Sequence, residues 1–296
     1  MTTSNPAAGV QATLAFHSQT AVPAKPFLKW VGGKQQLLPQ FADLYPPRFH
    51  RYFEAFLGGG AVFFHLWTMG RLTDHVCLSD NNDELVNVYL VVRDNLDALV
   101  DAVRVHEKRH DKAYYYQIRN WDRDATPMSP VARAARTIYL NRTCFNGLYR
   151  VNSKRQFNVP VGSYVNPKIL HTSVLEAAHQ ALQHVDVEVR DFRTLADSAR
   201  EGDFVYLDPP YHPLNATSSF TTYTADSFHE KDQQELAQLF ATLSDKGCLC
   251  MLSNSHTPLI LELYKKFRVE VVHAKRAVNA RGDGRGKIQE VVVLNY

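Results

Sequence analysis

The chain has 296 residues and an apolar fraction of 45%, enough for one large globular domain or two smaller ones. No apolar run approaches the roughly 20 residues that cross a bilayer, which excludes a long apolar span. The net charge of +3 is small for the whole chain, but it is unevenly distributed along the sequence.

Residues 1–24 are rich in Ala, Ser and Thr. They contain neither a basic start nor a continuous apolar stretch, so we predict a disordered tail rather than a signal peptide. We therefore expect a cytoplasmic protein.

The cysteines and histidines give no sign of a metal site. The spacing of the cysteines fits neither a disulfide framework nor a zinc site, so we predict buried thiols at Cys77, Cys144, Cys248 and Cys250. His106 and His110 lie four residues apart, but no carboxylate-rich pattern surrounds them. We therefore expect no metal.

The first predicted elements alternate between strand and helix. A strand over residues 51–56 precedes three glycines, and a helix is predicted over 61–69. A second strand over 75–80 is followed by a helix from about 83 to 93. This β-α-β-α order is typical of the start of a doubly wound sheet.

The alternation stops at about residue 94, and residues 94–170 are predicted to be largely helical. Between Arg104 and Lys168 there are 13 Lys or Arg and 4 Asp or Glu, a net charge of +9, which leaves −6 for the rest of the chain. Residues 125–170 contain no acidic residue. The basic side chains are interleaved with aromatic and amide side chains. This pattern favours nucleic-acid binding over a merely solvated basic face.

Strand–helix alternation resumes after residue 170. Strands are predicted over 185–189, 204–207 and 248–252, helices over 230–243 and 257–267, and a terminal antiparallel pair over 268–273 and 288–294. We therefore predict an α/β fold with a doubly wound, Rossmann-like sheet. Residues 25–82 and 171–296 would form this catalytic domain, and residues 83–170 an inserted helical recognition domain.

A glycine-rich turn, Phe56-Leu57-Gly58-Gly59-Gly60, follows the first predicted strand. Glycines in such a turn let a ligand approach the backbone closely. Asp80 ends the next strand, where a carboxylate suits the hydroxyls of a ribose. The spacing matches neither the dinucleotide fingerprint nor the P-loop, which disfavours NAD and ATP. The pair indicates a nucleoside cofactor, although a tight turn alone would contain similar glycines.

The most specific motif is Asp208-Pro209-Pro210-Tyr211, directly after a predicted strand. The two prolines fix φ and remove two N–H donors, which leaves carbonyl groups to face a cleft. The Asp208 carboxylate and the Pro209 carbonyl can accept both hydrogens of an exocyclic amine, and Tyr211 offers a face to a planar ring. Positioning and electrostatics would then favour attack of the amine on an electrophilic methyl group.

Three groups of segments, in this order, resemble the Dam family of DNA adenine-N6 methyltransferases (class α, D12 type). The first is Phe27-Leu-Lys-Trp-Val-Gly-Gly-Lys34 with Glu54-Ala-Phe-Leu-Gly-Gly-Gly60. The second is Tyr139-Leu-Asn-Arg142 with Phe145-Asn-Gly-Leu-Tyr-Arg150 and Phe157-Asn-Val-Pro-Val-Gly162. The third is Asp208 to Tyr211 with Phe220, Tyr223 and Phe228. The resemblance covers roughly residues 26–296.

The resemblance implies methyl transfer from S-adenosylmethionine to an adenine flipped out of double-stranded DNA, in GATC or a related site beginning GA. It implies catalytic roles for Asp208, Pro209 and Tyr211. Cofactor contacts are expected from Trp30, Lys34, Phe56, Gly58, Asp80, Asp191, Phe192 and Asp208. DNA contacts are expected from Lys29, Asn141, Arg142, Phe145, Asn146, Leu148, Arg150 and Pro160. Among these, Phe145 would fill the disrupted base stack and Arg150 would read a guanine.

Two positions depart from the family pattern. Ala55 replaces a proline before the glycine turn, and Ser163 stands where an arginine usually holds the DNA backbone. Lys154 or Arg155 could compensate for that arginine.

Other interpretations remain open at this point. These are a methyltransferase acting on RNA, protein glutamine or cytosine N4, or a DNA-binding protein without activity. Asp208 and the long basic insertion favour a DNA adenine enzyme, which we expect to be monomeric. Whether a restriction endonuclease accompanies it does not follow from the sequence.

Overall fold

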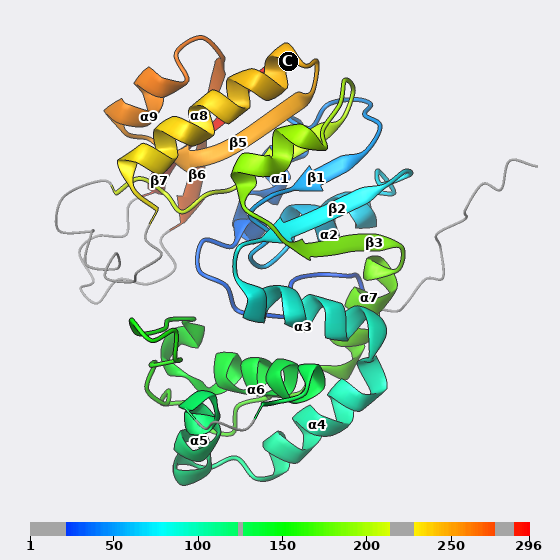
Figure 1. The fold of residues 1–296 in the computed structure, drawn as a ribbon, viewed down its shortest axis with the longest axis vertical. Helices are drawn as coiled ribbons and strands as arrows, with labels where there is room; N and C mark the ends of the chain where they lie inside the picture. The colour runs from blue at the N-terminus through cyan, green and yellow to red at the C-terminus, as the bar shows by residue number, and fades with distance from the viewer. Residues whose placement is uncertain (1–21, 124–126, 214–227, 276–286) are drawn as a thin grey trace, which may run out of the picture.

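A seven-stranded mixed sheet forms the centre of the computed structural model, which describes residues 22–123, 127–213, 228–275 and 287–296 (Figure 1). The strand order is β3-β2-β1-β4-β5-β7-β6, with β1 to β5 parallel and β7 antiparallel to both of its neighbours. The predicted doubly wound α/β fold and the terminal antiparallel pair are confirmed. The strands are β1 Tyr52–Glu54, β2 Val76–Asp80, β3 Val185–Val189, β4 Phe204–Leu207, β5 Leu249–Ser255, β6 Arg268–Lys275 and β7 Lys287–Leu294.

Most predicted helices are present at nearly the predicted bounds. The helix predicted over 257–267 is shorter, because the chain leaves helical geometry at Tyr264, and α7 was not predicted. The helices are η1 Lys34–Gln36, α1 Leu38–Phe41, α2 Ala61–Thr68, α3 Asp83–Asp94, α4 Leu96–Lys108, α5 Lys112–Arg119, η2 Asn120–Arg123, α6 Pro130–Thr143, η3 Phe145–Gly147, α7 Thr172–Leu182, η4 Phe192–Asp197, α8 Glu230–Asp245 and α9 Pro258–Leu263.

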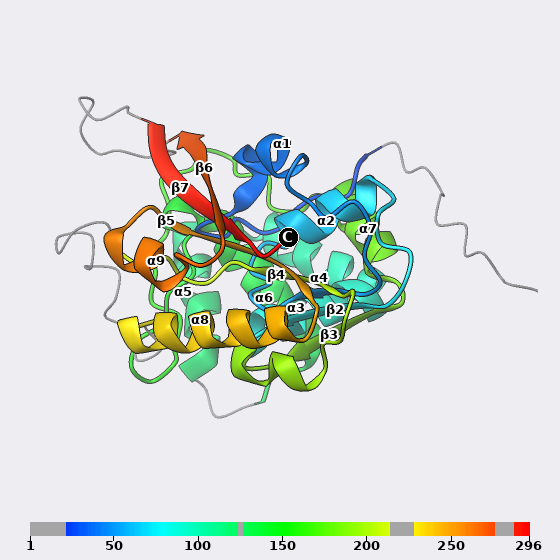
Figure 2. The same ribbon diagram turned by 90° about the horizontal axis from the view of Figure 1, so that it is seen from above.

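Both faces of the sheet are covered, as expected for parallel strands. Side chains that alternate along a strand enter two separate hydrophobic clusters: Tyr52 and Tyr206 pack on the side of α1 and α2, while Phe53 and Val205 pack on the side of α8. Figure 2 shows these helices on opposite sides of the strands. Helices therefore pack on both faces of the sheet, and the residues that follow its strands are held in fixed positions.

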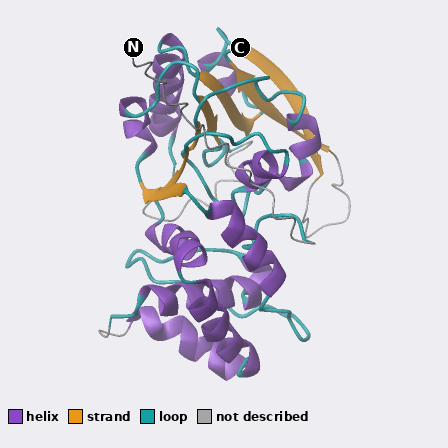
Figure 3. Cartoon of the chain, turned by 90° about the vertical axis from the view of Figure 1, so that its right-hand side faces the viewer, coloured by secondary structure: helices purple, strands orange, loops and turns teal. Residues whose placement is uncertain are grey.

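The insertion leaves the sheet after β2 and returns before β3. Its helix α6 packs against α3, α4 and α5, and α6 begins at Pro130 behind a Ser129 cap whose hydroxyl accepts from Ala132 N. Figure 3 shows the insertion helices gathered beside the sheet domain. Helix α3 also packs against β2, β3 and α7, so it belongs to the cores of both regions.

The four cysteines are buried free thiols, as predicted. His106 and His110 lie in the insertion, where their Nδ1 atoms are 2.8 Å from the hydroxyls of Tyr114 and Tyr139. Within the described part of the chain, no helix combines the length and apolar character needed to span a bilayer. Residues 1–21 of the predicted tail, and Phe220 and Tyr223, lie outside the described residues.

Candidate active site

The candidate site lies at the carboxyl edge of the three central parallel strands. Because β1 lies between β2 and β4, the glycine turn after β1, Asp80 at the end of β2 and Asp208 after β4 meet at one edge. In open α/β sheets, ligands bind outside the carboxyl ends of the strands. The sheet order therefore joins two motifs that lie far apart in the sequence.

Asp208 forms the centre of this edge together with Lys34. The Lys34 Nζ atom lies 2.9 Å from Asp208 Oδ1 and 4.6 Å from the centre of the Tyr211 ring. Lys34 is only 5% exposed. Burial raises the pKa of Asp208 to about 6, while Lys34 opposes the rise. Lys34 thus holds a negative charge at Asp208 in an environment that disfavours charge.

The two prolines are held by a polar network that the sequence motif does not reveal. Gln233 Nε2 donates to the Pro210 carbonyl at 2.9 Å, and Asn254 Nδ2 donates to Gln233 Oε1 at 3.0 Å. Asn254 Oδ1 in turn accepts from His212 N. Among the described residues, none donates a hydrogen bond to the Pro209 carbonyl.

Asp80 builds the glycine turn. Its Oδ2 accepts from Gly58 N at 3.0 Å and its Oδ1 from Asn82 N at 3.0 Å. Gly58 has a φ of +46°, and a Cβ there would lie 2.9 Å from Trp30 Cδ1, so the turn requires glycine. Burial raises the pKa of Asp80, and its backbone hydrogen bonds oppose the rise. Each carboxylate oxygen retains acceptor capacity for a ligand.

An aromatic cluster lies beside the glycine turn. The ring centre of Phe56 is 5.3 Å from that of Phe192 and 5.8 Å from that of Phe228. Neighbouring Asp191 is exposed, and its carboxylate pairs with Arg193 at 2.9 Å. The structure thus brings the expected residues Phe56 and Phe192 together.

Glu54, at the end of β1, is a buried acid that the sequence motif included without a role. Its Oε2 accepts from the Tyr52 hydroxyl at 2.7 Å and from Phe63 N at 3.2 Å. Burial raises the pKa of Glu54 to about 8, and the negative charge of Asp208 adds to the rise. At neutral pH Glu54 therefore carries a proton for most of the time and adds little negative charge behind the site.

Lys29, Asn141 and Arg142 tie the segment before η1 to the insertion. Lys29 N donates to Asn141 Oδ1 at 2.8 Å, and Asn141 Nδ2 donates to the Lys29 carbonyl at 2.7 Å. Arg142 Nη2 donates to the Phe27 carbonyl at 2.6 Å, and burial lowers the pKa of this arginine. Asn141 is buried, so it supports the segment internally, and its predicted contact with DNA stays a prediction.

The remaining residues predicted to contact DNA lie in one segment, residues 145–161, which we call the reading loop after that predicted role. Phe145 N donates to the Pro160 carbonyl, and Asn158 N donates to the Arg150 carbonyl. Phe145 is 49% exposed, Asn146 has a left-handed φ of +55°, and Leu148 is half-buried. Arg150 and Pro160 are exposed. Phe145, Asn146, Arg150 and Pro160 are therefore exposed to solvent, whereas Phe157 of the same loop is buried.

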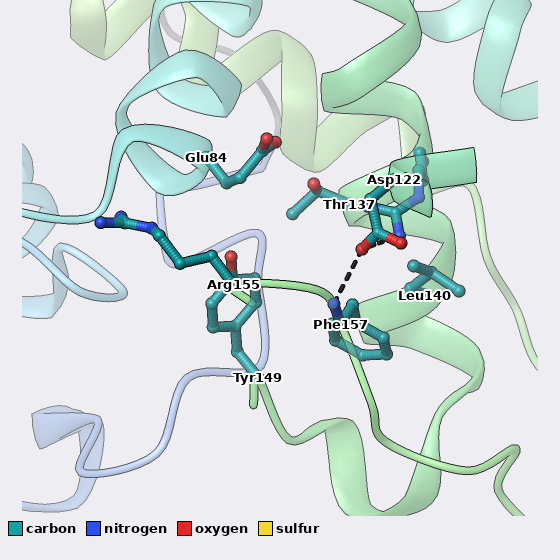
Figure 4. Close-up of a pocket in the computed structure, with 8 residues that line it drawn as sticks. Glu84, Asp122, Thr137, Leu140, Tyr149, Arg155 and Phe157 are labelled. Atoms are coloured by element: carbon teal, nitrogen blue, oxygen red, sulfur yellow. Dashed lines mark hydrogen bonds and ion pairs between the residues drawn. The ribbon is translucent and has the colours of Figure 1, made fainter. Parts of the chain in front are cut away.

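Tyr149 connects the reading loop to Trp30 in the segment before η1, a contact that the sequence did not predict. Its ring stacks on Trp30 with 5.3 Å between ring centres. Figure 4 shows Tyr149 and Phe157 lining a small pocket beside α6, where Phe157 N donates to Asp122 Oδ2 at 2.7 Å. Arg136 pairs with the same oxygen of Asp122 at 2.7 Å. The reading loop is thus held on both sides of Arg150, by Tyr149 on Trp30 and by Phe157 on Asp122.

The geometry agrees with a family match. Residues 30–278 match the family described as D12 class N6 adenine-specific DNA methyltransferase. The chain belongs to this family. The predicted reaction class is thereby confirmed: it is an adenine-specific DNA methyltransferase, and the interpretations as an RNA or protein-glutamine enzyme are not supported.

Curated relatives of this D12-class methyltransferase match over nearly their full length. Type II methyltransferase M1.LlaDCHI of Lactococcus lactis subsp. cremoris is 45% identical, covering 92% of this chain and 95% of the relative. Type II methyltransferase M.MjaIII of Methanocaldococcus jannaschii is 40% identical, covering 92% and 99%. The DNA adenine methylase of Escherichia coli (strain K12) is 32% identical, covering 90% and 94%.

Proposed function

We propose that this D12-class methyltransferase uses S-adenosylmethionine to methylate N6 of an adenine that is flipped out of double-stranded DNA. One observation carries the proposal. The half-buried Asp208 carboxylate, paired with Lys34, lies at the same sheet edge as the Gly58–Asp80 turn, and Lys34 also lies over the Tyr211 ring. An amine-binding group and a nucleoside-binding turn therefore border one space.

The residues present fit S-adenosylmethionine. Gly58 presents backbone where no Cβ could stand, and Asp80 retains acceptor capacity for the ribose hydroxyls. Phe56 and Phe192 offer apolar faces for the cofactor's adenine, with Asp191 at their edge, and Trp30 forms a further wall. When bound, S-adenosylmethionine supplies an electrophilic methyl group.

Asp208, Pro209 and Tyr211 would orient the target amine. The Asp208 carboxylate and the Pro209 carbonyl accept its two N–H groups, which turns the nitrogen lone pair toward the methyl group. The Tyr211 ring stacks on the base. Bound S-adenosylmethionine would supply the methyl group and leave as S-adenosylhomocysteine, and the methylated nitrogen would release one proton to solvent. Catalysis is by positioning and by the fixed charge of Asp208.

The reading loop, together with Lys29, would select the site. Phe145 fills the disrupted stack, Asn146 meets the orphaned partner base, and Arg150 reads a guanine in the major groove. We propose GATC, or a related site beginning GA, as the target, on the resemblance of these segments to the Dam family. Residues 83–170 would act as the recognition domain.

The proposal is tested by mapping methylation directly. The protein is incubated with labelled S-adenosylmethionine and plasmid DNA from a host without adenine methylation, and modified bases are located by single-molecule sequencing. N6-methyladenine at one sequence class supports the proposal, and a GA-containing class supports the target. Label in RNA or protein, with none in duplex DNA, would overturn it.

A further inference from the structure

The hydroxyl of Tyr211 is bound by Glu290, an acid from a distant part of the chain. The Tyr211 hydroxyl donates a hydrogen bond to Glu290 Oε2 at 2.7 Å, across 79 residues of sequence. Glu290 belongs to β7, outside the three segment groups on which the family resemblance rests. The contact links Tyr211, which follows β4, to strand β7.

The topology explains why a residue of β7 reaches this edge. β7 runs antiparallel between β5 and β6, and its register pairs Glu290 with Ser255 and Val272. Ser255 is the last residue of β5, so Glu290 lies at the carboxyl edge of the parallel strands. The next four residues, 291–294, are completely buried. The backbone that carries the Glu290 carboxylate is therefore held in the core.

The Tyr211 ring is consequently held at two points. Lys34 Nζ lies 4.6 Å from the ring centre, and the hydroxyl is bound at the far end of the side chain by Glu290. Burial raises the pKa of Tyr211 well above its usual value, so the phenol stays neutral and donates. A tyrosine held only by its Cα–Cβ bond would be free to turn about χ1 and χ2, and a stacking wall needs a fixed plane.

We propose that Glu290 is a positioning residue that fixes the plane of Tyr211 for stacking on the target adenine. The inference rests on the proposed function, in which Tyr211 touches the base. Glu290 acts through Tyr211 and does not touch the substrate. It is the hydrogen-bond acceptor that matters, so glutamine should replace glutamate at this position.

A double-mutant cycle tests the proposal. We expect Glu290→Ala and Tyr211→Phe each to lower kcat about tenfold, the size that loss of one hydrogen bond to a charged group can produce. The double variant should also lose about tenfold rather than a hundredfold, because both changes remove the same contact. Glu290→Gln should stay within about threefold of the wild type. Glu270→Gln is the matched control, since Glu270 pairs with Arg268 on the neighbouring strand β6.

A spectroscopic measurement separates positioning from general damage to the fold. DNA with 2-aminopurine at the target base reports the stacking of the flipped base through its fluorescence. Glu290→Ala and Tyr211→Phe should change this signal to the same extent at unchanged DNA affinity, and Glu290→Gln should restore it.

Several outcomes would overturn the inference. Multiplicative losses in the double variant, a normal signal in Glu290→Ala, or a glutamine variant as impaired as the alanine variant would each do so. If Glu290→Ala does not fold, a wild-type signal in Tyr211→Phe overturns it. A wild type that binds DNA but transfers no methyl group contradicts the proposed function instead.

Discussion

The sheet edge and the reading loop satisfy their polar groups in opposite ways. At the sheet edge, Lys34 is 5% exposed and already paired with Asp208, and the two prolines that follow Asp208 stiffen the backbone there. In the reading loop, Phe145 is 49% exposed and the guanidinium of Arg150 faces solvent with one bond, from Nε to Asn158 Oδ1 at 2.7 Å. The polar groups at the sheet edge are paired within the protein, whereas those of the reading loop are left to solvent and, under the proposed function, would be paired by DNA.

This difference follows from what each region has to do. Fixed charges accelerate a reaction most when they need no rearrangement at the moment of reaction, which favours a half-buried, paired Asp208. Groups that read a base must exchange water for DNA, which favours exposure. The stack of Tyr149 on Trp30 is one link between the reading loop and the segment before η1, and Asn141, which donates to the carbonyls of both Gly147 and Lys29, is another.

The largest effect is expected at the sheet edge. Asp208→Ala should lower the rate of methyl transfer by about a hundredfold or more, because it removes the fixed acceptor of the amine. DNA affinity should be largely retained, because the substitution leaves the residues of the reading loop unchanged. Single-turnover transfer of labelled methyl groups and a gel-shift assay measure the two quantities. Asp186→Ala, at an exposed acid that binds His75, is the control, and a normal transfer rate in Asp208→Ala would contradict the mechanism.

A smaller effect of a different kind is expected in the reading loop. Arg150→Ala should reduce discrimination between cognate and one-base-changed sites by about 10- to 100-fold, the value of one bidentate base contact. Lys154→Ala, at an exposed lysine nearby, should weaken binding to all sequences alike and lessen its salt dependence. Competition binding among near-cognate duplexes measures both. Unchanged discrimination between cognate and near-cognate sites in Arg150→Ala would show that Arg150 does not read a base and would point to other residues of the loop.

The sequence predicted the motif residues at the sheet edge better than the residues that hydrogen-bond to them. β3 and β4 lie at the predicted residues, and Asp208 to Tyr211 follow β4 as expected, because alternating apolar residues and proline pairs are local signals. Glu290, Gln233 and Asn254 were missed because their roles depend on pairings between distant segments. For Glu290, a shift of one residue in the register of β7 would place the side chain on the other face.

The contact between the two regions was missed for a similar reason. Tyr149 lies between two predicted DNA-contact residues, Leu148 and Arg150, yet it faces Trp30 rather than solvent. Only the packing of the insertion against the segment before η1 decides which side chains turn inward.

The buried contact of Glu54 did have a signal in the sequence, since a lone acid inside an apolar strand indicates a buried polar contact.

A moderate effect is expected at the contact between the regions. Tyr149→Ala should reduce by about fivefold the factor by which S-adenosylhomocysteine strengthens binding of cognate DNA, because the stack on Trp30 links the two sites. Tyr149→Phe keeps the ring and should behave as the wild type. Titration calorimetry with each ligand alone and with both gives the coupling factor. An unchanged factor in Tyr149→Ala would show that the stack on Trp30 does not carry the coupling.

The smallest effect is expected behind the site, at Glu54, and it is an effect on stability. Burial raises the pKa of Glu54 to about 8, so the folded state holds a proton that the unfolded chain releases at lower pH. The stability contributed by that proton is fully present below the unfolded pKa and is lost as pH rises through about 8. Glu54→Gln imitates the protonated acid, so it should already be more stable than the wild type at pH 6, where the unfolded wild-type chain has released its proton. Its advantage should be about 1 kcal/mol larger at pH 7. Chemical unfolding at the two pH values measures this difference, and parallel stability curves for the two proteins would show that Glu54 is ionised in the folded state.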